Sequence, residues 1–314
     1  MVPNYIKLNR EELFKEKIMK KKATASILII LFFIVLCKSL IAQEVFGLSY
    51  QYEYFPSAKL ADPTTNLEDM EIQTSTYKIG AAFPLVLAKG KIIILNSMNY
   101  RHVNFNYKNH PPDARIDQTQ SIEYTAFMID SLSAKWSMVV VITPGVASDF
   151  ESKVTADDFS FQGVFGFMRK FSEKFSLGSG IAYSREFGPS IPMPFIYFEW
   201  IILPKLSAKG LLPIDLNFLY KYNKKFDFGL FVGVSGNRYH GSPTKYDVDN
   251  PQMEYSEGTV SPKMQYHITD MLHLNIEGGY TFYRNFELLD GDKSHQSFDM
   301  ENSGYLRASF VFGI

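Results

Sequence analysis

Apolar and polar residues alternate along most of the chain after residue 43. A period of two places successive side chains on opposite faces of a β-strand. In 272–283 one face would carry Leu272, Leu274, Ile276, Gly278, Tyr280 and Phe282, and the other His273, Asn275, Glu277, Gly279, Thr281 and Tyr283. The pattern predicts an all-β protein whose strands have one apolar face and one polar face.

Short polar turns join these strands in pairs, and longer polar connections separate the pairs. The turns LSAKWSM at 132–138 and FSEKFSL at 171–177 each place a short polar run before a new alternating stretch. The longer connections are 57–69, 108–118, 148–158, 240–258 and 288–299. Tight turns at one end and longer loops at the other are typical of a membrane barrel. We therefore predict a transmembrane antiparallel up-and-down β-barrel.

The alternating stretches number about 14, with one ambiguous segment at 188–222. That segment alternates little at 201–203 and contains Pro204 and Pro213, so about 12 strands is the alternative count. An even number places both ends of the barrel on the periplasmic side. The predicted strands lie near 45–55, 70–83, 91–106, 118–129, 135–147, 158–169, 175–187, 194–201, 206–212, 214–222, 226–239, 255–268, 271–286 and 300–313.

The composition agrees with strands that face lipid on one side and water on the other. Aromatic residues make up 15% of the 314 residues, with 27 Phe and 19 Tyr, while the mean hydropathy is only −0.09. Many aromatic residues at near-neutral hydropathy are expected when only every second side chain meets the bilayer. A soluble periplasmic β-sandwich rich in tyrosine is the alternative at this point.

The N-terminal region has the pattern of an export signal. Lys20, Lys21 and Lys22 precede an apolar run over 27–37, and Ala42 supplies a small residue for cleavage. The run is shorter than the roughly 20 residues of a membrane-spanning helix. We expect residues 19–42 to be a cleavable signal peptide and 43–314 the barrel. Residues 1–18 would be an extended n-region or precede the true start at Met19. A retained membrane anchor is the alternative.

Removal of this leader changes both the cysteine content and the charge. The single cysteine, Cys37, would leave with it, so the remainder could form neither disulfides nor a cysteine nucleophile. A lipoprotein signal at Cys37 is disfavoured because the bulky Leu36 precedes it. Residues 1–42 hold eight of the 32 basic and three of the 33 acidic residues, which leaves 24 and 30 and a net charge of −6. This charge does not favour nucleic acid as a partner.

The segments YQYEYFPSAKL at 50–60 and FSEKFSLGSG at 171–180 carry a family resemblance. Together with the export signal and the alternating aromatic strands, they resemble an uncharacterised family of Gram-negative outer-membrane β-barrel proteins with no assigned activity. The resemblance covers 44–314 and its motifs are architectural. It implies location in the cell outer membrane, contact with outer-membrane lipids, and recognition of the final strand by the barrel-assembly machinery.

The final stretch, YLRASFVFGI, is predicted to close the barrel. Its apolar face would hold Leu306, Ala308, Phe310, Phe312 and Ile314. An open sheet edge in hydrocarbon leaves backbone groups unsatisfied, so this strand is expected to pair with the strand near 45–55. It ends in Gly-Ile, where outer-membrane barrels commonly end in an aromatic residue.

Charged residues on the inward faces are the candidates for function. By the alternation, the lumen would present Glu53, Lys78, Arg101, Glu123, Glu199, Lys263, Glu277 and Arg307. One interpretation is a structural network in which each buried charge is paired. The other is a polar lining along the path of a small solute.

No recognisable catalytic or cofactor motif accompanies these charges. The six histidines form no metal-ligand spacing, and there is no G-x-S-x-G nucleophile elbow. We therefore expect no catalytic residues, metal or cofactor. The role would be passive: a narrow channel, a small-ligand binder or a closed structural barrel. The alternative is a membrane-embedded lipid-modifying or proteolytic enzyme with a Ser, His and acid from different strands.

Overall fold

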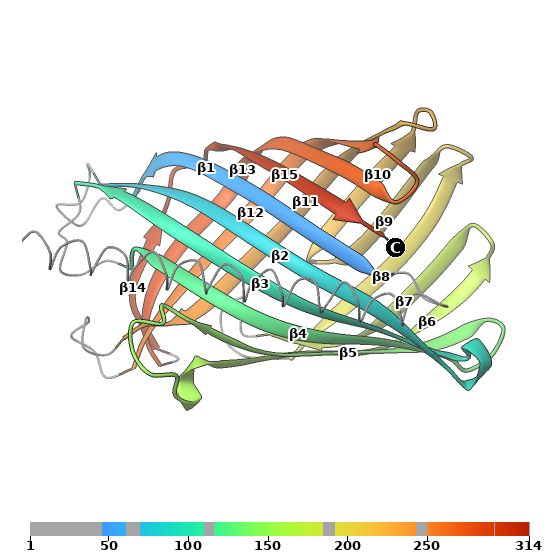
Figure 1. Cartoon of the computed structure of the whole chain (residues 1–314), viewed down its shortest axis with the longest axis horizontal. Coiled ribbons are helices and arrows are strands. Elements are labelled where there is room, and N and C mark those ends of the chain that lie inside the picture. The colour runs from blue at the N-terminus through green and yellow to red at the C-terminus, as the bar shows by residue number, and fades with distance from the viewer. Residues whose placement is uncertain are drawn as a thin grey trace, which may run out of the picture. The chain divides into compact units, whose positions relative to one another are not determined.

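The computed structural model describes residues 46–60, 70–109, 116–184, 192–242, 250–291 and 293–313. The chain divides into Met1–Val45 and Phe46–Ile314, so the expected leader lies outside the described residues, as does Ile314. Fifteen strands occur in the described part (Figure 1). They are β1 (Gly47–Lys59), β2 (Glu71–Leu87), β3 (Ile92–Lys108), β4 (Gln118–Ser131), β5 (Trp136–Ser148), β6 (Phe159–Ser172), β7 (Phe175–Tyr183), β8 (Pro192–Leu203), β9 (Leu206–Leu212), β10 (Asp215–Lys221), β11 (Phe226–His240), β12 (Pro251–His267), β13 (Leu272–Asp290), β14 (Lys293–Asp299) and β15 (Gly304–Phe312).

Neighbouring strands pair antiparallel around a closed ring. The ring is completed by β12 with β13, by β13 with β15, and by β15 with β1, where Leu48 lies opposite Phe312. The predicted pairing of first and last strands is therefore confirmed. Closure gives each strand of the ring a paired neighbour on both sides, as a barrel in lipid requires. It excludes the β-sandwich alternative.

Fourteen of the described strands form the barrel, and β14 pairs only with the outer part of β13. The ambiguous segment 188–222 contributes β8, β9 and β10, which settles the count in favour of the higher prediction. The loop expected at 288–299 is instead the end of β13 and all of β14. Its polar composition concealed a strand pair because β14 lies outside the ring, where polar side chains meet water.

The outer face of the barrel is covered by apolar side chains at alternate positions. On β6 and β15 these include Phe161, Phe165, Phe167, Phe310 and Phe312, all exposed in the isolated chain. Such a belt is buried only when lipid surrounds it. In the described residues, no helix is long and apolar enough to cross a membrane.

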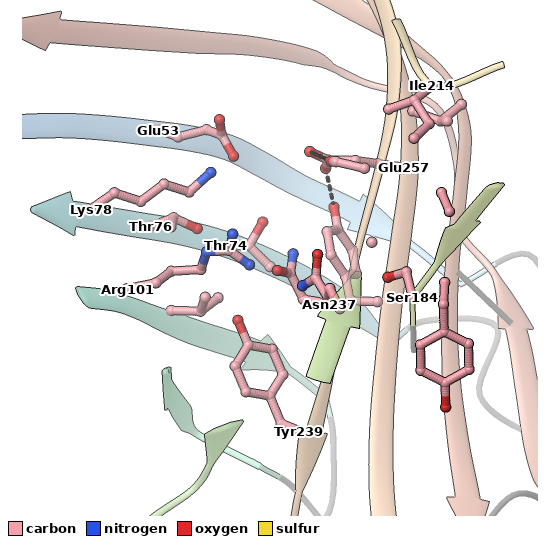
Figure 2. Close-up of a pocket in the computed structure, with 18 of the residues that line it drawn as sticks. Glu53, Thr74, Thr76, Lys78, Arg101, Ser184, Ile214, Asn237, Tyr239 and Glu257 are labelled. Atoms are coloured by element: carbon pink, nitrogen blue, oxygen red, sulfur yellow. Dashed lines mark hydrogen bonds between the residues drawn. The ribbon is translucent and has the colours of Figure 1, made fainter. Parts of the chain in front are cut away.

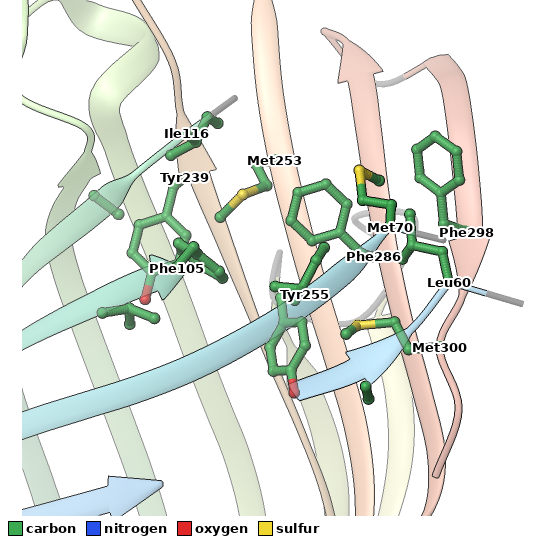
Figure 3. Close-up of a cluster of buried hydrophobic side chains, with 14 residues drawn as sticks. Leu60, Met70, Phe105, Ile116, Tyr239, Met253, Tyr255, Phe286, Phe298 and Met300 are labelled. Carbon is green, nitrogen blue, oxygen red and sulfur yellow. The ribbon is translucent and has the colours of Figure 1, made fainter. Parts of the chain in front are cut away.

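The interior at the end that carries the long connections is filled by apolar side chains (Figure 3). Ile72, Phe105, Met253 and Phe286 point inward there and are almost wholly buried. Leu60, Met70, Ile116, Phe298 and Met300 add residues that flank the connections. We call the whole cluster the apolar plug. Because close-packed side chains leave little free volume, it narrows the lumen at this end.

Strand β11 leaves the wall near this end and approaches β5. It pairs with β10 only as far as Gly233, and Val234 N then donates to Ile214 O at 2.9 Å. Further along, His240 lies beside Ser148 of β5 in a parallel bridge, and Asp149 N donates to His240 O at 3.1 Å. At the long-connection end, β11 therefore lies directly beside β5, and β6 to β10 do not separate them.

Candidate ligand-binding cavity

A cavity of about 310 Å³ lies in the lumen between the apolar plug and a layer of charged residues. Its lining combines charged, polar and apolar side chains. Glu53, Lys78, Arg101 and Glu257 supply the charges, Val164, Ala182, Met193, Ile214 and Val234 supply apolar groups, and Gln162, Tyr183 and Ser184 add polar groups beside the apolar ones. Figure 2 shows Glu53, Lys78 and Arg101 facing Ser184 and Ile214 across this space. The cavity is therefore amphipathic.

A row of three charges on adjacent strands forms the centre of the charged layer. Glu53 of β1 lies opposite Arg307 of β15, which lies opposite Glu277 of β13. Arg307 Nη1 donates to Glu277 Oε2 at 2.8 Å, and Arg307 Nε donates to Glu53 Oε2. One guanidinium thereby bridges two carboxylates, which offsets the cost of burying Glu53, only 4% exposed.

Two further cations line the cavity beside this row. Lys78 of β2 lies opposite Gln51 of β1 on one side and opposite Arg101 of β3 on the other. Both side chains reach the cavity that Glu53 also lines. Two like charges in register repel each other, so the carboxylates of Glu53 and Glu257 are needed to balance them. This arrangement can hold a polar group of a solute by charge-assisted hydrogen bonds.

The other three predicted lumen residues lie apart from this cavity. Lys263 lies opposite Glu277 and donates to Asn217 Oδ1. Glu123 lines a smaller space, of about 20 Å³, which Arg101 also borders. Glu199 accepts a hydrogen bond from Tyr197, and its Oε1 lies 3.5 Å from Lys209 Nζ. The side chain of Glu199 is half exposed.

The alternation did not identify Glu257 and Arg284 as charged residues of the interior, for different reasons. Glu257 accepts from Tyr255 OH at 2.9 Å and from Ser235 Oγ at 3.1 Å. Glu257 is an even number of residues from Lys263 on the same strand, so the alternation of the sequence places both on the same face.

The alternation along β13 predicts the wrong face for Arg284. A register shift between Gly258 and Thr259 breaks the alternation on β13. Tyr283, predicted on the polar face with Thr281, is instead 47% exposed beside the exposed Phe282, whereas Arg284 turns inward and is 1% exposed. A β-bulge reverses the parity of every residue beyond it. Arg284 then donates to Tyr255 OH at 3.1 Å.

Two polar atoms of residues that line the cavity have no hydrogen-bond partner among the described residues. They are Thr74 Oγ1 and Asn237 Oδ1, and Thr74 is 2% exposed. Both atoms are buried in the surrounding side chains, and a buried hydroxyl or amide without a partner costs free energy.

A serine, a histidine and an acid do meet elsewhere, where β5 approaches β11. His240 Nδ1 lies 2.9 Å from Asp158 Oδ1, and Ser148 Oγ donates to the backbone O of His240 at 3.1 Å. Burial would raise the pKa of Asp158, but hydrogen bonds from Thr155 N and from side chains that include His240 outweigh it and lower that pKa. All three side chains are buried, and the serine hydroxyl is directed to a carbonyl rather than the imidazole. The group holds two strands together and does not present a nucleophile.

The described residues contain no group of three His, Cys, Asp or Glu side chains placed to hold a metal ion. The lining of the cavity offers hydrogen bonding, ion pairing and apolar contact.

A closed antiparallel barrel with an apolar outer belt and a charged lumen defines an integral β-barrel protein of the outer-membrane class. The chain belongs to the family described as a domain of unknown function (DUF6268), which matches residues 38–314. This agrees with the expected resemblance to an uncharacterised barrel family.

Comparison with curated proteins finds no match, whereas solved structures of similar architecture exist. An outer membrane channel from Pseudomonas putida F1 is 11% identical, with 86% of this chain and 95% of that chain covered and a TM-score of 0.44. The P. putida toluene transporter TodX is 7% identical, with 87% and 90% covered and a TM-score of 0.41. The NanC porin is 11% identical, with 85% and 100% covered and a TM-score of 0.38.

Proposed function

We propose that this barrel binds a small solute in its lumen and passes it across the outer membrane without chemical change. The observation that carries the proposal is the cavity of about 310 Å³. For scale, an engineered apolar cavity of roughly half that volume holds a benzene molecule. The apolar plug and the charge row leave room for small solutes rather than polymers.

The amphipathic lining supports binding rather than a purely structural lumen. A closed structural barrel would pair its inward charges with one another and fill the remaining space with side chains. Here a space of about 310 Å³, which Lys78 and Arg101 help to line, is not filled by side chains. In this proposal Arg307 pairs with the carboxylates of Glu53 and Glu277, and the open space takes the solute.

Conductance and liposome swelling with the refolded protein test this function. We expect small single-channel steps in a planar bilayer, and Arg101→Ala should change their size or ion selectivity because it removes a cation from the lumen. Lys108→Ala is the matched control, since Lys108 pairs with Glu71 at 2.7 Å and is exposed. Absence of both conductance and swelling in the unmodified protein would reduce it to a closed barrel.

The export and assembly steps belong to the same proposal. Residues 19–42 would be removed near Ala42, which N-terminal sequencing of protein from outer-membrane fractions can check. Strand β15 would be the segment that the barrel-assembly machinery recognises. Its outward residues Leu306, Phe310 and Phe312 are exposed, and β15 must pair on both edges to close the ring.

A further inference from the structure

The wall of the barrel is lowest at β9 and β10, which have seven residues each. The neighbouring β8 and β11 have 12 and 15 residues. At about 3.3 Å per residue and a tilt of about 40°, seven residues rise roughly 18 Å, against an apolar band of about 25 Å. The two strands therefore fall short of crossing the membrane.

Strands β9 and β10 are shorter than their neighbours only at the long-connection end. At the other end the strands start level, as Lys221 N donates to Lys205 O and Ile201 N donates to Lys174 O, both at 2.8 Å. At the long-connection end, β9 stops at Leu212 opposite Ile196, and Ile214 in the following turn meets β11 at Val234. Beyond this turn, toward the long-connection end, no described strand lies between β8 and β11. We call this gap between the described strands, bordered by 192–195, 213–214 and 234–238, the notch.

The notch lies at the level of the apolar belt. Along β7, Ser179 lies opposite Ile196, and Ile181 lies opposite Pro194, further toward the long-connection end. Ile181 is 58% exposed, and Phe161 on β6 is exposed beyond it. Lipid-facing side chains on neighbouring strands therefore continue past the β9–β10 turn.

The backbone of β8 is suited to an unpaired edge at this position. Ile201 N points to the β7 side, and the β7–β8 register is unbroken. Because backbone donors alternate between the two sides of a strand, Met193 and Phe195 also face β7, and Pro192 and Pro194 face the notch. Proline has no N–H, so this edge carries no unsatisfied donor at those two positions.

The notch leads into the cavity. Val234, which the alternation places on the lipid face with Phe228 and Leu230, lines the cavity instead. Met193 and Ile214 border the notch and line the cavity as well. Irregular edges at membrane depth are tolerated where they line a cavity that holds water or another molecule. Along the axis, the apolar plug narrows the direct path to the long-connection end.

We propose that the notch is a lateral opening between the cavity and the hydrocarbon region, and that the solute is a small amphipathic molecule which crosses it. This inference rests on the proposed binding function and names the class of solute. Its apolar part would contact Val164, Ala182 and Met193, and its polar group would reach Lys78 and Arg101, which line the same cavity.

Cysteine labelling in liposomes tests the opening without assuming transport. In a Cys37→Ser background, single cysteines replace Met193 at the notch, Gln265 on the inner wall of β12, and Met98 on the lipid face. Each is treated with N-dodecylmaleimide dissolved in the bilayer and with a charged, membrane-impermeant maleimide. Heat-modifiable gel migration confirms that each variant is folded.

An open notch predicts that Met193→Cys reacts with the bilayer-dissolved reagent nearly as fast as Met98→Cys. Its rate should exceed that of Gln265→Cys by on the order of 100-fold, because the alkyl chain concentrates the reagent in hydrocarbon. Addition of Ile214→Trp should slow labelling at 193 roughly tenfold, since the indole adds bulk at the border of the notch, and should leave Met98→Cys unchanged.

Labelling at 193 by the charged reagent only would overturn the lateral opening and leave the proposed binding function intact. Labelling by neither reagent would also overturn it. A second measurement protects the result if Ile214→Trp fails to fold. Decanol and decanoate should protect Met193→Cys from the bilayer-dissolved reagent in the otherwise unmodified barrel, and butylammonium should not. Equal protection by all three would refute the amphipathic class.

Discussion

Removal of the Arg307 guanidinium is predicted to destabilise the barrel strongly. Arg307→Met keeps an unbranched side chain but loses the hydrogen bonds to Glu53 and Glu277. Glu53 would then remain buried at 4% exposure without the cation that contacts it. The perturbation therefore leaves an uncompensated charge rather than only an absent contact.

The magnitude can be worked out in two ways. Removing one partner of a buried ion pair costs about 3–5 kcal/mol. Counting bonds, two hydrogen bonds between charged groups at about 1.5–3 kcal/mol each give roughly 3–6 kcal/mol. The exposed pair Lys209–Glu199, at 3.5 Å with side chains 62% and 50% exposed, provides the control. Lys209→Met should cost about 0–1 kcal/mol.

Urea unfolding in lipid vesicles, followed by the fluorescence of Trp136 and Trp200, measures both variants. The double variant Glu53→Gln with Arg307→Met should recover at least about 1 kcal/mol relative to Arg307→Met, because the almost fully buried side chain at position 53 then carries no charge. An Arg307→Met barrel no less stable than Lys209→Met would refute the reasoning. So would a double variant less stable than Arg307→Met.

Three further predictions follow from other parts of the wall. Phe310→Arg places a charge on the lipid face and should cost about 2–4 kcal/mol near mid-membrane, seen as a loss of folded barrel in outer-membrane fractions. Gly180→Ala should destabilise the barrel because its Cβ would lie 2.1 Å from Phe165 O, whereas Gly278→Ala has no heavy atom closer than 3.8 Å; thermal unfolding compares the two. Asp158→Asn should lower stability at neutral pH, and the difference from the unmodified protein should disappear as the pH falls below about 4.

The sign of the last prediction follows from the lowered pKa of Asp158 in the folded protein. A carboxyl with a lowered folded pKa contributes stability above its unfolded value and loses it as the pH falls through the folded value. A difference that grows on acidification would contradict this assignment. Equal thermal stability of Gly180→Ala and Gly278→Ala would contradict the crowding at Gly180, and normal assembly of Phe310→Arg would contradict the lipid contact of β15.

The alternation of side chains predicted most of the wall because a half-buried strand in lipid must repeat every two residues. It located the apolar belt and the first and last strands as partners. It failed at Arg284 because a single extra residue in β13 reverses the parity. No local feature of the sequence marks that bulge.

The cavity was less predictable than the wall. Lys78 and Arg101 were expected in the lumen, but their position beside open volume depends on β11 bending away from β10 to meet β5. That bend brings together Ser148, Asp158 and His240, which are far apart along the chain. Hydrogen bonds between distant segments leave no periodic signal in either segment.

The sequence by itself determined the class of fold, because the choice between lipid and water at each side chain is a local property that a period of two records directly. Only the tertiary structure decided where the lumen is filled and where it is open. Those features depend on the relative heights of β8 to β11 and on which side chains meet across the barrel, and both arise only when the ring closes.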